Sequence, residues 1–320
     1  MSLKKLAIII TLSFFPLILF FGVKSTKVKN TVKKYVCTNC NSSVRDVVVV
    51  EDVDEFYEKA IDLLKPYDII DEKKVRIGRD FDGGYVTIDS ILKQSDVVLS
   101  YGVADDISFE EDLLMKYENI NKIYTSDCSV EGLPESKLAP NLLQKFVFSK
   151  TCIGKKNTSG LYKSDGNEVF KSLEEQIKEN SLQDSKIFIK MDIEGGEYSA
   201  FDEISEDVWS KITGIVVETH WINDVANQKK FIKLISELNK NFVLINIHGN
   251  NHAPLVVFAD YSNNLLELDK NLPAVIELSY ISKKYVKNLA LSQTIFPSNL
   301  DRNNRQSGFD YVINFHLKKN

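Results

Sequence analysis

The sequence lacks three motifs that mark common nucleotide and hydrolase sites. No G-x-G-x-x-G follows a strand-like segment, which disfavours a nicotinamide or flavin site of the usual kind. No G-x-x-x-x-G-K-[ST] is present, so the chain is not a P-loop enzyme, and no G-x-S-x-G marks a serine hydrolase. Internal repeats and low-complexity tracts are also missing. With 320 residues, the chain is long enough for one large globular domain with attachments, or for two domains.

Positive charge is scarce outside the N-terminal segment. Eight of the 40 basic residues but only one of the 45 acidic residues lie in 1–46, so 47–320 carries a net charge of −12. A surface that acidic lacks the electrostatic footprint of a nucleic-acid binder. We therefore expect no nucleic-acid partner, and a small molecule or a glycan rather than a polyanion.

Cysteine is present only four times. Cys37 and Cys40 form a C-x-x-C, but no second pair completes a four-ligand zinc site. A disulfide or plain thiols are both compatible with that pair. Cys128 and Cys152 follow strand-like segments, and we expect them to be small buried groups.

One long apolar run stands near the start of the chain. Residues 6–23, LAIIITLSFFPLILFFGV, carry no charge and are at the short end of what spans a bilayer as a helix. A cleaved signal peptide is the alternative, but no A-x-A-like site follows. We expect a single-pass membrane anchor. Lysines flank the run on both sides, so its orientation stays open, with the lumen of the secretory pathway as the expected compartment in a eukaryote.

Strand-like and helix-like segments alternate from residue 97 onward. This rhythm predicts an α/β fold with a mostly parallel sheet, doubly wound, and its strand-rich end predicts an antiparallel edge. A helix over 54–65 and a hairpin over 75–88 precede it. The expected strands are 96–102, 122–127, 144–151, 187–191, 214–220, 241–251, 254–260 and 273–281, and the expected helices are 108–117, 168–180 and 228–240.

Polar residues follow the apolar part of most of these strands. Because ligands bind outside the carboxyl ends of parallel strands, we expect these side chains to form one site. Three of the four histidines fall on two neighbouring strand ends. The candidates in chain order are Tyr101, Gly102, Asp105, Asp127, Asp192, Glu194, Glu218, His220, His248 and Asn250.

Several of these segments resemble the FkbM-like family of class I S-adenosylmethionine-dependent methyltransferases. KMDIEGGEYSAF (190–201) is the most specific match, and LSYGVADDISFEEDL, IYTSDCS, GIVVETHW and INIHGNN follow the family's order. RIGRDFDGGYV (76–86) is similar to an N-terminal block of the same group. The resemblance covers roughly 75–285. It departs from the class pattern at Ser100, where an acid commonly opens the first loop.

The resemblance implies a Rossmann-like sheet of seven strands with helices on both faces, here preceded by a transmembrane helix. Together with the apolar run and the basic segment after it, which lie outside the resemblance, it leads us to expect an anchor (1–23), a basic stalk (24–46), a helix and hairpin extension (47–95), a methyltransferase domain (96–285) and a C-terminal extension (286–320). The implied reaction is methyl transfer from S-adenosylmethionine to a hydroxyl, often on a sugar.

The resemblance also assigns roles to the candidate residues. Tyr101 and Gly102 would face the methionine part of the cofactor, Asp127 its ribose, and Asp192 or Asp105 its polar end. Histidine titrates near neutrality, so we expect His220 to be the base, oriented by Glu218, with His248 as the second candidate. The residues expected to contact the acceptor are Arg79, Asp82, Glu194 and Asn250.

Three alternatives stay open. Asp192, Glu218 and the histidines could hold a divalent metal, but the spacing does not compel one and no metal ligand is assigned. The chain could also be a catalytically silent binding protein on a methyltransferase scaffold. An anchored glycosyltransferase fits less well, because it usually needs D-x-D and this sequence offers D-x-E at 192–194.

Overall fold

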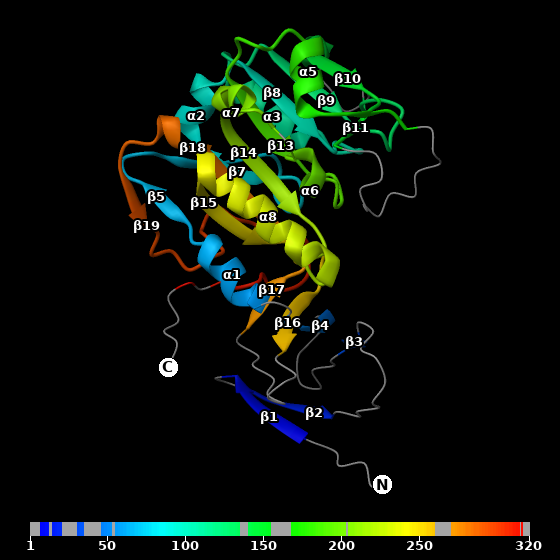
Figure 1. Ribbon diagram of the computed structural model, residues 1–320, viewed down its shortest axis with the longest axis vertical. Coiled ribbons are helices and arrows are strands. Elements are labelled where there is room, and N and C mark those ends of the chain that lie inside the picture. The colour runs from blue at the N-terminus through cyan, green and yellow to red at the C-terminus, as the bar shows by residue number, and fades with distance from the viewer. Residues whose placement is uncertain are drawn as a thin grey trace.

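A seven-stranded sheet organises the protein (Figure 1). The computed structural model describes residues 7–12, 15–20, 31–34, 46–52, 55–134, 140–154, 168–202, 204–259, 270–313 and 315. The sheet order is β10-β9-β8-β13-β14-β18-β15. Its strands are β8 (Val97–Tyr101), β9 (Lys122–Ser126), β10 (Phe146–Ser149), β13 (Ile187–Met191), β14 (Ile212–Thr219), β15 (Phe242–Gly249) and β18 (Ile276–Ser282).

Six of these strands are parallel and β18 is antiparallel to both of its neighbours. The predicted mostly parallel sheet is therefore confirmed. The antiparallel strand, however, lies one place in from the edge, between β14 and β15. Every residue of β18 is buried, which suits a strand covered on both faces better than an edge strand.

The direction in which strands are added reverses next to β8. From β8 the chain adds β9 and β10 on one side, and then returns to place β13 on the other side. Such a switch point leaves a gap between the loops that follow the two strands, and ligands bind there in open α/β sheets. We call the edge where the parallel strands end the carboxyl edge.

Each face of the sheet packs against its own hydrophobic core. One core contains Leu99 and Ile189, and α1 (Phe56–Leu63), α5 (Leu173–Glu179), α6 (Glu197–Ala200), α7 (Glu206–Lys211) and α8 (Val225–Asn241) contribute to it. The other contains Val98 and Phe188, covered by α2 (Asp89–Gln94), α3 (Ser108–Lys116), α4 (Pro140–Leu143) and the hairpin of β6 (Lys74–Ile77) and β7 (Tyr85–Ile88). This period-two alternation follows from the strand geometry.

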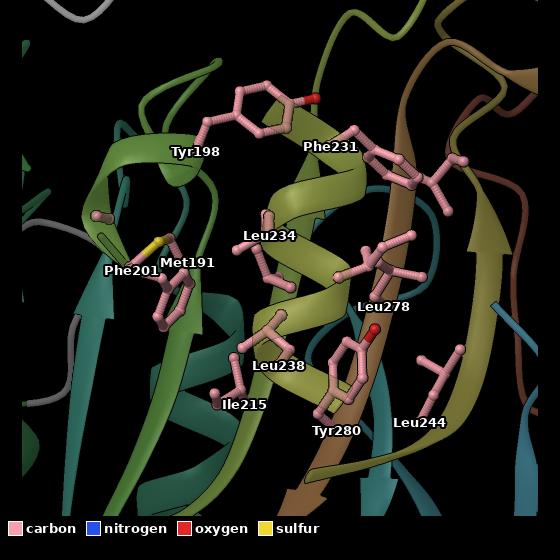
Figure 2. Packing of buried hydrophobic residues seen from close by; sticks show 14 of the residues in the cluster. Met191, Tyr198, Phe201, Ile215, Phe231, Leu234, Leu238, Leu244, Leu278 and Tyr280 are labelled. Atoms are coloured by element: carbon pink, nitrogen blue, oxygen red, sulfur yellow. The ribbon is translucent and has the colours of Figure 1, made fainter. Parts of the chain in front are cut away.

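Helix α8 shows why the sequence pattern predicted a helix there. Phe231, Leu234, Ile235 and Leu238 recur at helical spacing and all four are buried. Figure 2 shows three of them over the sheet residues Ile215, Leu278 and Tyr280. Full burial of each such side chain contributes about 1.5–3 kcal/mol.

Smaller sheets lie outside the main one. The expected strand 254–260 forms β16 (Leu255–Ala259), which pairs with β17 (Asn271–Pro273) and β4 (Asp46–Glu51) instead of extending the main sheet, and β4 pairs with β3 (Thr31–Lys34) inside the predicted stalk. The remaining elements are β5 (Tyr67–Ile69), β11 (Cys152–Ile153), β12 (Phe170–Lys171), the 3₁₀ turn η3 (Lys283–Tyr285) and β19 (Leu289–Leu291).

The prediction of an anchor helix is wrong for residues 7–12 and 15–20. These residues form two antiparallel strands, β1 (Ala7–Leu12) and β2 (Phe15–Phe20). Three consecutive isoleucines favour an extended backbone, and Pro16 lacks the N–H that a helix interior needs. Over the described ranges, no helix has the length and apolar character to cross a bilayer. The rest of 1–23 lies outside the described residues.

The expectation that Cys128 and Cys152 are small buried groups is wrong. They form a disulfide, and both residues are only half-buried. The bond joins the segment after β9 to the start of β11. The C-x-x-C at Cys37 and Cys40 lies outside the described residues.

Candidate functional site

The ends of β8 and β13 are in direct contact at the switch point. The Asp192 N–H donates to the Tyr101 carbonyl at 3.0 Å. Gly102 has φ +74°, and a Cβ there would lie 1.6 Å from the Asp192 carbonyl oxygen. Glycine is therefore required for the two strand ends to meet. The Tyr101 side chain is fully buried in the core, so only its backbone reaches the carboxyl edge.

Asp127, at the end of β9, forms a hydrogen bond with the loop that follows β8, which we call the first loop. Its Oδ2 accepts a hydrogen bond from the Ala104 N–H at 2.8 Å, and its Oδ1 accepts one from the Ser129 N–H at 2.7 Å. A ligand hydroxyl would share this carboxylate with both loops. Asp105, the next residue of the first loop, is exposed.

A buried polar group lies beneath the first loop. Ser100 Oγ donates to Glu110 of α3, and Lys190 Nζ donates to the Tyr101 and Gly102 carbonyls. Burial raises the pKa of Glu110, against the lowering effect of Lys190.

Three ionisable residues stand in a row across neighbouring strands. Glu218 of β14 is the register partner of Glu277 of β18, which is also the partner of His248 of β15. Register partners point to the same face, about 4.5–5.5 Å apart at Cβ. Glu218 is 4% exposed and Glu277 is 6% exposed. Burial, followed by the charge of Asp192, raises the pKa of Glu218 to about 8.

His220 lies just beyond Glu218 and is surrounded by carboxylates. Its Nε2 is 3.1 Å from Glu218 Oε1, 3.6 Å from Asp192 Oδ1 and 3.7 Å from Glu194 Oε2. Its Nδ1 is 3.4 Å from Oε1 of the buried Glu197 and makes no hydrogen bond to any described residue. Burial alone lowers the pKa of His220, but the negative charges of the neighbouring Glu197 and Glu218 carboxylates hold it well above the usual range.

His248 is held more completely. Its Nδ1 is 2.9 Å from Glu277 Oε2, and its Nε2 is 3.0 Å from both carboxylate oxygens of Asp310 in the C-terminal segment. Burial lowers the pKa of His248, but the charge of Glu277 and the hydrogen bond with Asp310 raise it well above the usual range. Both ring nitrogens therefore have partners in the folded chain.

The turn between β6 and β7 contributes Asp82 to the same cluster of polar side chains. Asp82 Oδ1 accepts hydrogen bonds from Asn304 Nδ2 at 3.0 Å and from Asn250 Nδ2 at 3.5 Å. Asn250 Nδ2 also donates to Glu218 at 3.2 Å. The Tyr85 hydroxyl donates to Asp192 Oδ2 at 3.3 Å. Residues far apart in the sequence thus meet around one set of carboxylates.

Four residues near this edge adopt left-handed backbone conformations although they are not glycine. They are Phe81 (φ 68°), Ala104 (φ 40°), Glu194 (φ 54°) and Trp221 (φ 63°). Each such residue costs about 1–2 kcal/mol relative to a right-handed conformation. Strain of this kind gathers at sites where the chain holds a side chain or loop in place for a ligand.

Most of the candidate residues come together in the structure. Gly102, Asp127, Asp192, Glu194 and His220 lie along one edge, joined by the contacts above. Asp82, Glu218 and Asn250 lie beside them. Arg79 instead pairs with Asp106 at 3.0 Å and donates to the Asp82 carbonyl, on the outside of the turn.

Three ionisable members of the site were missed in the sequence. Glu277 was visible as a single acid within an apolar strand, but it begins an antiparallel strand, so it did not count as a strand end. Glu197 lies in the matched motif and is fully buried. Asp310 left no signal, because its segment reaches the site only through the tertiary fold.

No protein-family model and no curated protein sequence matches this chain. Among solved structures, a fibrillarin pre-rRNA processing protein of Methanococcus jannaschii matches with 10% identity and a TM-score of 0.28. The match covers 68% of this chain and 84% of that one. A TM-score this low supports no argument about fold or function.

Proposed function

We propose that this protein is an S-adenosylmethionine-dependent methyltransferase that methylates a hydroxyl group, with a sugar or glycan as acceptor. The position of Asp192 carries the proposal. Its backbone fixes the end of the first loop through Tyr101 and Gly102, while its side chain lies 3.6 Å from His220 Nε2. One residue therefore joins the expected cofactor side of the site to the expected acceptor side.

The arrangement of the sheet supports a ligand at this position. The loops after β8 and β13 flank the switch point, where the crevice of an open α/β sheet forms. The motif KMDIEGGEYSAF, which carries the family resemblance, supplies Asp192, Glu194 and Glu197. The cofactor would be held by the first loop, with Asp127 for the ribose hydroxyls and Asp192 or Asp105 for the methionine end.

Bound S-adenosylmethionine supplies a methyl group on a positively charged sulfur, so the chain's own task is to align the acceptor and remove its proton. His220 Nε2 and Glu218 Oε1 lie 3.1 Å apart, so the protonation of one affects the other. We assign the proton of the acceptor hydroxyl to this pair. Because the surrounding carboxylates keep His220 protonated at neutral pH, the reaction is expected to be faster on the alkaline side.

A polyhydroxylated acceptor suits the chemistry of the cluster. Hydroxyl groups donate hydrogen bonds, and the partly exposed carboxylates of Asp82, Asp192 and Glu194 accept them. The same negative charge disfavours phosphorylated or carboxylated acceptors. We therefore propose a neutral sugar or glycan.

For the compartment, we propose the secretory lumen or the cell exterior. The disulfide between Cys128 and Cys152 supports this, because such bonds persist in oxidising environments and are rare in the cytosol. Membrane attachment through residues 1–23 stays part of the proposal. Protease protection of the chain in sealed microsomes, with and without detergent, tests the side on which the domain lies.

Calorimetric titration with S-adenosylmethionine is the experiment that tests the function. We expect binding with a stoichiometry of one, and about tenfold weaker binding for Asp127→Ala, since the ribose loses a charged hydrogen-bond partner. Ser129→Ala is the matched control, because it removes a hydroxyl that contacts Asp127 but keeps the carboxylate. Equal losses in both variants would make Asp127 a loop-positioning residue.

The same titration separates the alternatives. A folded chain that binds no S-adenosylmethionine but binds a nucleotide-sugar would be a glycosyltransferase. A chain that binds neither would be a silent binding protein. Incubation with labelled S-adenosylmethionine and a glycan extract then identifies the methylated product.

A further inference from the structure

We propose that Asp192, Glu218 and His220 form a binding site for a divalent cation of the Mn²⁺ or Mg²⁺ kind. These three residues each offer one ligand atom, and the three atoms lie within 4.8 Å of one another. The sequence spacing alone did not favour a metal, because the three residues come from the ends of two strands that are adjacent only in the sheet.

The distances between the ligand atoms fit one cation. Nε2 of His220 lies 3.1 Å from Glu218 Oε1 and 3.6 Å from Asp192 Oδ1. Two neighbouring ligands in an octahedral site with bonds near 2.1 Å are about 3.0 Å apart. Small rotations of the side chains are therefore enough to place all three atoms at bonding distance.

The histidine makes this more than a cluster of acids. Its side chain is 3% exposed, and Nε2 points among Glu218, Asp192 and Glu194. Nδ1 has no hydrogen bond to a described residue, and the carboxylate of Glu197 lies 3.4 Å away. A metal-bound histidine typically gives its other ring N–H to a carboxylate, which fixes the tautomer. Glu197 is placed for that role, and His220 Nε2 is then free for the cation.

Charge also favours a cation. The carboxylates of Asp82, Asp192, Glu194, Glu197, Glu218 and Glu277 surround this position. Among the basic groups near these carboxylates are His220, His248 and Arg76, and His248 is already paired with Glu277 and Asp310. Buried carboxylates need a paired charge, and a divalent ion supplies more than one.

The donor set identifies the kind of cation. Two carboxylates and one imidazole are harder than the sulfur-rich sets that zinc prefers in structural sites, and oxygen ligands suit Mg²⁺, Ca²⁺ and Mn²⁺. The imidazole favours Mn²⁺ among these. A second group, Asp82, Glu218 and Glu277, shares Glu218 but contains no histidine, and Asn250 and Asn304 already donate to it.

The existence of the cation site does not depend on the proposed function. The role of the cation in catalysis does rest on the proposed methyl transfer. If a sugar hydroxyl is the acceptor, a cation bound to its oxygen lowers the pKa of that hydroxyl and fixes its position beside the cofactor. While the cation is bound, Glu218 and His220 serve as its ligands, so the proton leaves to solvent or to the nearby Glu194 carboxylate. The Glu218–His220 pair takes the proton only in the metal-free chain.

Calorimetry of the metal-free full chain with Mn²⁺ tests the proposal. We expect one saturable Mn²⁺ per chain, weakened at least about tenfold in Asp192→Asn and His220→Gln. Glu237→Gln on the exposed side of α8 is the control, because it removes one carboxylate away from the site and should leave binding unchanged. Pulsed EPR of the bound Mn²⁺ should show coupling to an imidazole nitrogen, which is read on the wild-type chain even if a variant fails to fold.

Three results would overturn the assignment. They are no saturable binding by the folded wild-type chain, no nitrogen coupling, or a greater loss in Glu277→Gln than in Asp192→Asn, which would place the ion in the other group. A chain that binds S-adenosylmethionine but no Mn²⁺ overturns this inference alone, and the reverse result overturns the proposed function alone.

Discussion

His220 and His248 occupy equivalent places in the sequence but different environments in the structure. Each lies at the carboxyl end of a strand of the same sheet, His220 just after β14 and His248 near the end of β15, and each contacts buried carboxylates. His248 has a partner on both ring nitrogens, at 2.9 and 3.0 Å. His220 has three carboxylates around Nε2 at 3.1–3.7 Å. Its Nδ1 makes no hydrogen bond to a described residue, although Glu197 Oε1 lies 3.4 Å away. A histidine whose contacts are complete within the chain stabilises the fold, whereas one with incomplete contacts is available to a ligand.

The largest effect should come from removing His220. We expect His220→Gln to lower kcat by at least about 100-fold, which is the usual contribution of a positioned proton acceptor. The dissociation constant for S-adenosylmethionine should change little, since His220 belongs to the acceptor side. Steady-state kinetics together with calorimetry measure both quantities. Equal losses in kcat and cofactor affinity would make His220 a structural residue.

For His248 the expected loss is in stability. His248→Gln removes a buried charge between Glu277 and Asp310, and leaving carboxylates unpaired in this way costs about 3 kcal/mol. Urea denaturation of the variant and the wild-type chain gives the difference in the free energy of unfolding. Asp310→Asn is the companion variant, because it removes one of the two negative charges that pair with His248 and keeps a side chain of the same size. If His248→Gln left stability unchanged and lowered kcat, the two histidines would have to exchange roles.

The smallest expected effect is a dependence of stability on pH, to which both histidines and Glu218 contribute. The pKa of His220, His248 and Glu218 is raised in the folded state, so the folded chain binds more protons than the unfolded one. Their stabilising contribution is therefore complete below the unfolded pKa values and is lost as the pH rises through the folded ones. We expect the free energy of unfolding to fall as the pH rises from about 4.5, the unfolded pKa of Glu218, through its folded pKa of about 8, with the two histidines adding to the fall above their usual pKa.

Denaturation at a series of pH values measures this slope, and Glu218→Gln should reduce it, since a neutral amide cannot lose a proton. Saturating Mn²⁺ should reduce it as well if the cation displaces the proton of His220. A slope of the opposite sign would mean that these groups do not dominate the titration of the folded chain.

The predictable part of the site came from local patterns. Asp192, Glu218 and His220 each come near the end of an apolar run. Because parallel strands all end at the same edge of a sheet, the residues at their ends lie close together. The unpredictable part came from segments that approach the site from elsewhere. Asp310 and Asn304 reach it from the C-terminal segment, and Glu277 reaches it from the opposite end of an antiparallel strand.

The sequence by itself determined the alternating strands and helices, the parallel sheet and the polar residues at its carboxyl edge, because the periodicity of apolar residues is a local property of the chain. Only the tertiary structure decided which acid surrounds which histidine and the pairing of Cys128 with Cys152. Those outcomes depend on contacts between residues distant in the chain, and no local pattern encodes a distance in space.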